Sequence, residues 1–156
     1  MDEFLIPNAN FKRLYEEFKK YGSLSIGVDF DNTIYDYHQK GYTYSSVIQL
    51  ILRAAKLGMK IHIFTAQRDQ ELVKKFCQDR GILIEGINTD GIKLEWECRK
   101  PFYSLLLDDR AGLISAYEDL LKLVETLEDE AYEEAVIQQI IAFENLTGDE
   151  EIHSSN

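Results

Sequence analysis

Apolar residues recur at two different periods along this chain, and the periods alternate as far as Leu107. Alternation at every second position, as from Leu24 to Phe30, is typical of strands, whereas recurrence at i, i+3, i+4 and i+7 is typical of amphipathic helices. Strands that alternate with helices predict an α/β fold with a mainly parallel sheet and right-handed crossovers. Strand patterns occupy 24–30, 60–65, 82–87 and 104–107, and helical patterns occupy 10–21, 45–57 and 69–80.

Polar residues and glycines mark the ends of the three helical patterns. Asn10 can cap the first helix, Ser45 or Ser46 opens the second, and the third begins at Asp69. A glycine follows each helix as an expected stop signal, at Gly22, Gly58 and Gly81.

The C-terminal third keeps the helical period with many glutamates between its apolar positions. An acidic interaction tail is one interpretation of such a sequence. The regular apolar positions favour instead a packed pair of helices over 113–147. Residues 148–156 are polar and are expected to form a frayed tail.

Length and composition predict one compact domain over 1–156, because 156 residues with 45% apolar content supply a sizeable core. The net charge of −11 disfavours broad contacts with nucleic acid or an anionic membrane. The sequence also lacks an apolar run of about 20 residues, and its first residues do not resemble a signal peptide. We therefore expect a cytoplasmic protein without a membrane partner, in which Cys77 and Cys98 are thiols.

Acidic and polar side chains follow three of the predicted strands. Asp29 and Asp31 lie two residues apart after the first strand, Thr65 ends the second, and Asp108 and Asp109 follow the last. The carboxyl ends of parallel strands meet at one edge of a sheet, where ligands collect. Two carboxylates beside a buried strand are costly unless a cation or a shared proton relieves them. This pattern predicts a metal-assisted site.

The donor types narrow the choice of metal. Lys100 precedes the last strand, so an ammonium group can join the carboxylates and the threonine hydroxyl. This set suits a phosphate and a hard cation such as Mg²⁺, which binds few protein carboxylates together with substrate oxygens. Zinc would favour histidine or cysteine, and the chain has only three histidines, none paired at ligand spacing.

Four ordered motifs resemble those of the haloacid dehalogenase-like (HAD) hydrolases: DFDNT, the Thr65 that follows IHIF, Lys100, and the DD of LLLDDRAG. The resemblance spans roughly 24–112 and implies a three-layer α/β/α sandwich with a Rossmann-like sheet. Neither 33–65 nor 65–100 is long enough to add a domain, so the chain resembles members without a sizeable cap. Small members of this type are similar to the phosphatase half of phage polynucleotide kinases.

The resemblance also implies an activity, which is Mg²⁺-dependent hydrolysis of a phosphomonoester. Asp29 would attack phosphorus and form an aspartyl phosphate, while Asp31 would act as general acid and base. Thr65 would donate a hydrogen bond to the phosphoryl group, and Lys100 would balance its charge. The implied substrate contacts are Asn32, Thr65, Ala66 and Lys100, and the implied Mg²⁺ ligands are Asp29, Asp31, Asp108 and Asp109.

Several of these roles have structural alternatives. Asp29 and Asp31 could form a turn after the strand, and Thr65 could cap the next helix. Asp109 could pair with Arg110, a neighbour in the sequence. Lys93 or Arg99 could take the place of Lys100.

The expected partner is a phosphorylated small molecule or a nucleotide, and the oligomeric state stays open. A polynucleotide 3′-phosphatase is an alternative, although the net charge counts against a nucleic-acid partner. A non-catalytic metal- or phosphate-binding module on the same fold is another alternative. Tyrosines after the first motif could pack on the surface or stack on a base or sugar: Tyr35, Tyr37, Tyr42 and Tyr44.

Overall fold

The structure, a computed structural model, describes residues 2, 5–91, 95 and 101–148. The chain divides into two compact units, Met1–Val124 and Glu125–Asn156. The elements in chain order are α1 (Ala9–Tyr21), β1 (Ser25–Val28), α2 (Ser45–Lys56), β2 (Lys60–Ile63), α3 (Gln70–Asp79), β3 (Gly86–Ile87), β4 (Leu105–Leu107) and α4 (Leu113–Gly148).

The first unit is built on a four-stranded parallel sheet with the order β3-β2-β1-β4. Central strand β1 pairs Val28 with Ile63 of β2 and with Leu107 of β4. The chain therefore adds strands outward from β1 on one side and then returns to its other side for β4. This topology confirms the predicted α/β fold with a parallel sheet.

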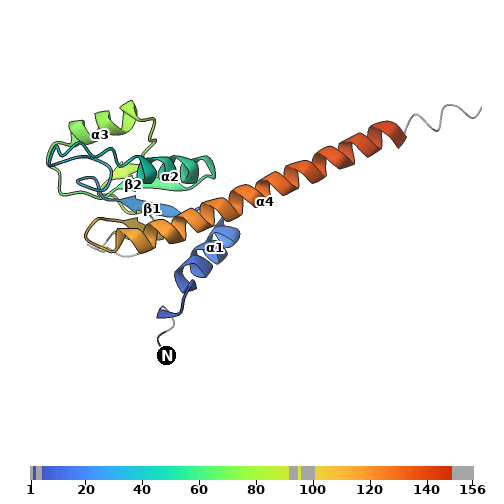
Figure 1. Cartoon of the computed structure of the whole chain (residues 1–156), viewed down its shortest axis with the longest axis horizontal. Coiled ribbons are helices and arrows are strands. Elements are labelled where there is room, and N and C mark those ends of the chain that lie inside the picture. Colours follow the sequence, from blue (N-terminus) through green and yellow to red (C-terminus); the bar gives the residue numbers. More distant parts are fainter. Residues whose placement is uncertain (1, 3–4, 92–94, 96–100, 149–156) are drawn as a thin grey trace, which may run out of the picture. The chain divides into compact units, whose positions relative to one another are not determined.

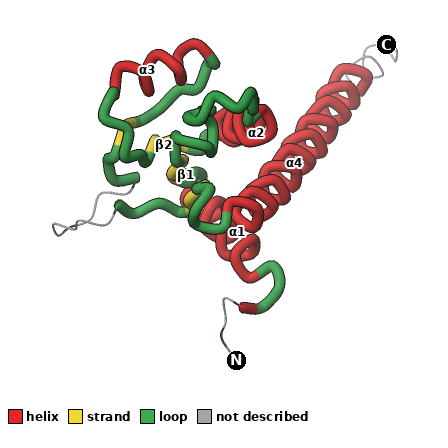
Figure 2. The backbone as a smooth tube through the Cα atoms, turned by 60° about the vertical axis from the view of Figure 1, so that its left-hand side comes forward, coloured by secondary structure: helices red, strands yellow, loops and turns green. Residues whose placement is uncertain are grey.

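Helices cover both faces of this sheet. Helices α2 and α3 lie on one face, and α1 and the first turns of α4 lie on the other (Figures 1 and 2). The described chain between β1 and β2 consists of one loop and α2, which leaves no room for a sizeable cap domain there. The three-layer arrangement thus agrees with the sequence prediction.

The core lies where the helices meet the sheet. Alternating strand residues Ile26 and Val28 are fully buried, as is Leu14 of α1. Burying each large aliphatic side chain stabilises the fold by about 1.5–3 kcal/mol relative to leaving it in water. The other aliphatic side chains larger than alanine with at most 1% exposure are Ile34, Leu50, Ile51, Ile61, Ile63, Leu107, Leu120 and Leu123, with Val73 and Val124.

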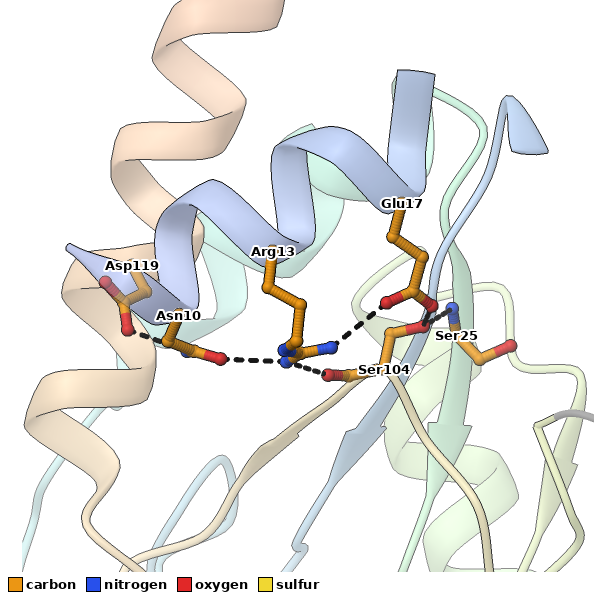
Figure 3. Close-up of polar contacts among 6 residues, drawn as sticks. All are labelled: Asn10, Arg13, Glu17, Ser25, Ser104 and Asp119. Carbon is orange, nitrogen blue, oxygen red and sulfur yellow. Dashed lines mark hydrogen bonds and ion pairs between the residues drawn. The ribbon is translucent and has the colours of Figure 1, made fainter. Parts of the chain in front are cut away.

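Helix α1 is held by a chain of polar contacts at the amino-terminal edge of the sheet (Figure 3). Arg13 donates hydrogen bonds to the Ser104 carbonyl oxygen at 2.8 Å and to the Glu17 carboxylate at 3.0 Å. The Ser104 hydroxyl donates to Glu17 at 2.6 Å, and Asn10 donates to Asp119 of α4 at 2.7 Å. These contacts join α1 to the start of β4 and to α4.

The N-terminal boundary of α1 differs from the prediction. Asn10 lies inside the helix, and Asn8 occupies the capping position with a left-handed backbone (φ 65°) and no side-chain cap. At the start of α3 the prediction holds, because the Asp69 carboxylate accepts a hydrogen bond from the Leu72 backbone N–H at 2.9 Å.

The C-terminal segment is one helix and not the predicted pair. Helix α4 runs without interruption from Leu113 to Gly148. The physical reason is visible in the sequence, because 113–147 contains neither glycine nor proline and so offers no residue suited to a sharp turn.

Candidate functional site

The first and last acidic motifs meet because β1 and β4 end side by side. Val28 pairs with Leu107, and the Asp29 backbone N–H donates to the Leu107 carbonyl oxygen at 2.8 Å. The next residue on each strand is an aspartate. As a result, carboxylate oxygens of Asp29, Asp108 and Asp109 all lie within 4.8 Å of one another. These three side chains form a cluster that could hold a metal ion.

Thr33 connects two members of this cluster and was not singled out in the sequence. Its hydroxyl donates to Asp29 Oδ2 at 3.0 Å and accepts from the Asp109 backbone N–H at 3.1 Å. The Thr33 side chain is fully buried, so neither bond competes with bulk water. Its position inside DFDNT was a signal, but nothing in the sequence identified Asp109 as its partner.

The Asp29 carboxyl is held in an unfavourable electrostatic environment. Burial is the main cause, and the negative charges of Asp108 and Asp109 add to it, while the Thr33 hydrogen bond opposes them. Together they raise the pKa of Asp29 to about 6. Proton uptake or a bound cation would relieve this strain.

Asp31 lies outside the three-carboxylate cluster but lines the same cavity. Burial raises its pKa, and a hydrogen bond from the Gln67 side chain opposes that rise. Its Oδ1 atom is buried and has no hydrogen-bond partner among the described residues. A carboxyl with a raised pKa and a spare oxygen suits proton transfer.

The turn that carries Asp29 and Asp31 is anchored through the residue between them. Phe30 is fully buried, stacks on Tyr35 at 4.8 Å between ring centroids and meets Phe76 of α3 edge-on at 5.2 Å. The Phe30 carbonyl oxygen also accepts from the Tyr35 backbone N–H at 2.9 Å. This aromatic cluster fixes the backbone from which both aspartates project.

Thr65 lies just beyond β2, where Asn88 clamps its backbone. Asn88 accepts from the Thr65 N–H and donates to the Thr65 carbonyl oxygen, both at 2.8 Å. The buried Thr65 hydroxyl accepts from the Gln67 N–H at 3.0 Å. Thr65 is not among the cavity-lining residues, whereas Ala66 and Gln67 are.

The cavity beside the cluster has a volume of about 500 Å³ and carries both signs of charge. Arg68 and Arg110 line it, and neither forms an ion pair with a carboxylate in the described part of the chain. The alternative Asp109–Arg110 salt bridge is therefore not observed. The complete lining is Asp29, Asp31, Asn32, Tyr37, His38, Ala66, Gln67, Arg68, Asp108, Asp109 and Arg110.

Three predicted cations lie outside the described residues: Lys100 and its alternatives Lys93 and Arg99. The described cations at the cavity, Arg68 and Arg110, were not singled out as substrate contacts in the sequence. Each comes shortly after the end of a parallel strand, and this position was the available signal.

The cluster has the chemistry of a hard-cation site. All three side chains supply carboxylate oxygens, which Mg²⁺ prefers, and the negative charges of Asp108 and Asp109 add to the burial that raises the pKa of Asp29. A divalent cation would offset these negative charges. The residues present therefore fit Mg²⁺.

Comparisons with known proteins identify the fold alone. No protein-family model matches the sequence, and no curated protein matches it. A solved structure of a conserved protein from Bacteroides thetaiotaomicron is similar, with a TM-score of 0.52 and 20% identity. The match covers 69% of this chain and 92% of that chain. Among the described helices, none is long and apolar enough to cross a membrane.

Proposed function

We propose that this protein is a Mg²⁺-dependent phosphoric monoester hydrolase of the HAD type. The observation that carries the proposal is the meeting of Asp29 with Asp108 and Asp109 at the carboxyl edge of the sheet. Asp31 lines the same cavity two residues further on. A pair of aspartates with these separate environments can divide the work between a nucleophile and a proton donor.

The three clustered carboxylates would hold the ion, with the Asp31 backbone carbonyl as the further expected ligand. Bound Mg²⁺ would offset the negative charges of Asp29 and of the phosphate that approaches it. The Thr33 hydroxyl donates a hydrogen bond to Asp29 Oδ2 and would thereby help to orient this carboxylate.

The proposed reaction has two displacement steps at phosphorus. First, a carboxylate oxygen of Asp29 forms a bond to phosphorus while the bond to the ester oxygen breaks, and Asp31 gives its proton to that oxygen. Asp31 then accepts a proton from water, whose oxygen attacks phosphorus and breaks its bond to Asp29. Inorganic phosphate leaves, and both aspartates regain their starting states.

Positive charge at the cavity supports a phosphate-bearing substrate. Arg68 and Arg110 can contact phosphoryl oxygens through several N–H groups. Lys100 keeps its expected charge-balancing role, and Thr65 its expected hydrogen bond, as parts of this proposal.

A phosphate-release panel tests the proposal. Wild-type protein with Mg²⁺ should release phosphate from aryl phosphates or from a member of a metabolite and nucleotide panel, and chelation should stop the release. Asp29→Asn should lower kcat by roughly 1,000-fold or more and Asp31→Asn by roughly 100-fold or more. Asp79→Asn removes an exposed carboxylate that pairs with Lys75 on α3, so it is the matched control and should stay near wild type.

Two outcomes would count against the hydrolase. Full activity in Asp29→Asn would reject the nucleophile. Failure of every panel member, combined with Mg²⁺ or phosphate binding by calorimetry, would favour the non-catalytic binding module.

A polynucleotide 3′-phosphatase is the second candidate, and the cavity lining favours it. Tyr37 offers an aromatic surface in the same cavity as Arg68, a combination that suits a base and its phosphate. End-labelled oligonucleotides with a 3′-phosphate should then show higher kcat/KM than the matching mononucleotides. Equal values for both would dismiss this candidate.

A further inference from the structure

The second unit presents an apolar surface on one side of α4. Val136, Ile137, Ile140 and Ile141 follow one another at helical spacing and share a face. The three isoleucines are 54%, 53% and 45% exposed. We call these four residues the isoleucine patch; they belong to the orange-to-red part of α4 in Figure 1.

Negative charge surrounds this patch along the same helix. Between Glu125 and Gly148 there are seven acidic residues and no lysine or arginine. Glu133 precedes Ile137 by four residues, and Asp129 precedes Glu133 by four, so both continue the patch toward the N-terminus. Glu144 follows Ile140 by four residues at the other end.

Contiguous exposed aliphatic side chains with a polar rim are typical of docking surfaces. A helix that lays an apolar stripe against such a surface is a recurrent mode of recognition. The position of the patch on a helical face therefore favours a helical occupant.

Charge decides between a second copy of this chain and a different partner. In a parallel pair of α4 helices joined at the patch, Asp129 and Glu133 would each lie beside their own copies, and in an antiparallel pair centred on the patch Glu133 would oppose Glu144. Both arrangements place like charges together, which is unfavourable. An anionic membrane surface would be repelled for the same reason.

We propose that the isoleucine patch binds a basic amphipathic helix of a partner protein. The partner would place leucine-like side chains against Ile137, Ile140 and Ile141. Its lysines or arginines would face Asp129 and Glu133, and the opposite charges would set its direction and register. This inference is independent of the proposed catalysis, since all its residues belong to the second unit.

A designed peptide tests the proposal on the full chain. The probe is a fluorescent 20-residue helix with leucines at i, i+3, i+4 and i+7 and lysines beside them. The first control peptide has the same composition in an order that destroys the stripe, and the second replaces its lysines with glutamates. Fluorescence anisotropy should show binding of the basic amphipathic peptide that weakens as salt rises, with at least roughly tenfold weaker binding of both controls.

Variants locate the contact. Ile137→Gln combined with Ile140→Gln should weaken the peptide roughly tenfold or more, while glutamine preserves helix propensity and hence the circular dichroism. Leu83→Gln is the matched control, because Leu83 is 85% exposed in the first unit, and it should leave binding unchanged. Phosphate release by the double variant should equal that of wild type.

Three results would overturn the proposal. Equal binding of the amphipathic and reordered peptides would reduce the effect to bulk charge attraction. A dimer in analytical ultracentrifugation that the double variant abolishes would assign the patch to a second copy. A large drop in the melting temperature of the double variant without peptide would show that the patch is covered within the chain.

Discussion

The raised pKa of Asp29 links the stability of the protein to pH. Its folded-state pKa of about 6 lies above its usual value, so the folded state holds the proton more tightly than the unfolded chain does. The free energy of unfolding should therefore fall as the pH rises from about 4 to about 6. Above that range the ionisation of Asp29 should change it no further.

Asp29→Asn tests this linkage because it removes the charge and keeps the shape. In metal-free buffer at pH 8 the free energy of unfolding of the variant should exceed that of wild type by about 1–2 kcal/mol. This figure allows for the partial exposure of the Asp29 carboxyl to solvent. The gain should vanish near pH 4, and Mg²⁺ should stabilise wild type more than the variant. Urea titrations at four pH values, with and without Mg²⁺, measure this; a less stable variant at pH 8 without metal would refute the argument.

Thr33 should matter for metal binding as well as for folding. Thr33→Val keeps the size but removes one donor and one acceptor, which leaves the Asp109 backbone N–H unpaired. We expect a loss of about 1–3 kcal/mol in the free energy of unfolding and weaker Mg²⁺ binding. Thr33→Ser keeps the hydroxyl and should recover most of both, as measured by urea unfolding and calorimetry. Equal Mg²⁺ affinity in Thr33→Val and Thr33→Ser would show that the Thr33 hydroxyl does not contribute to metal binding.

Site residues that directly follow a strand could be predicted from the sequence. Hydrogen bonds between residues far apart in the sequence could not. Asp29, Asp31 and Asp108 could be located because the sequence marks strand ends. The hydrogen bond of Thr33 with Asp109 spans 76 residues, and that of Asn88 with Thr65 spans 23. Such partners depend on strand order and register, which a hydrophobic pattern does not specify.

At the scale of elements, the Asn88 clamp holds the loop after β2. Asn88 has a left-handed backbone (φ 54°), so glycine can replace it without strain and removes only the side chain. Asn88→Gly should cost about 1–3 kcal/mol of unfolding free energy and raise KM, because Ala66 and Arg68 would lose their fixed positions. Asn88→Ala should cost more, since alanine also strains the backbone. Steady-state kinetics and urea unfolding would test this prediction. An unchanged KM would show that the Asn88 hydrogen bonds contribute to stability but not to substrate binding.

The starts of helices α2 and α3 could be predicted from the residues at those positions. Ser45 begins α2 and Asp69 caps α3, as the sequence indicates. The strand predicted over 82–87 is paired only at Gly86–Ile87, where it forms the edge strand β3 beside β2. The division of 113–147 into two helices was wrong, because the apolar period continues through a stretch without a glycine or proline that could end the first helix.

At the scale of the whole molecule, the two units should be separable. A chain that ends after Glu128 keeps the sheet, the acidic cluster and the buried residues up to Leu127. It should melt cooperatively within about 5 °C of the full chain and keep its response to Mg²⁺. It should also lose binding of the basic peptide. Circular dichroism melts and Mg²⁺ titrations measure this, and an unfolded truncated protein would show that the second unit is needed for stability.

The overall architecture was the most predictable level. Alternating strand and helix patterns lead to a parallel sheet with few alternatives, because crossovers are right-handed and short. The position of α1 was not predictable, since Arg13 and Asn10 form hydrogen bonds with residues that come 91 and 109 positions later in the sequence.

Those distant partners of α1 have a consequence for how the protein is made. Helix α1 leaves the ribosome well before its partners, because Ser104 follows Arg13 by 91 residues and Asp119 follows Asn10 by 109 residues. The second edge of the central strand β1 likewise stays unpaired until β4 has been synthesised. Nascent chains that stop short of Asp119 should remain sensitive to proteases, and the native state of the first unit should form only after Asp119 has emerged.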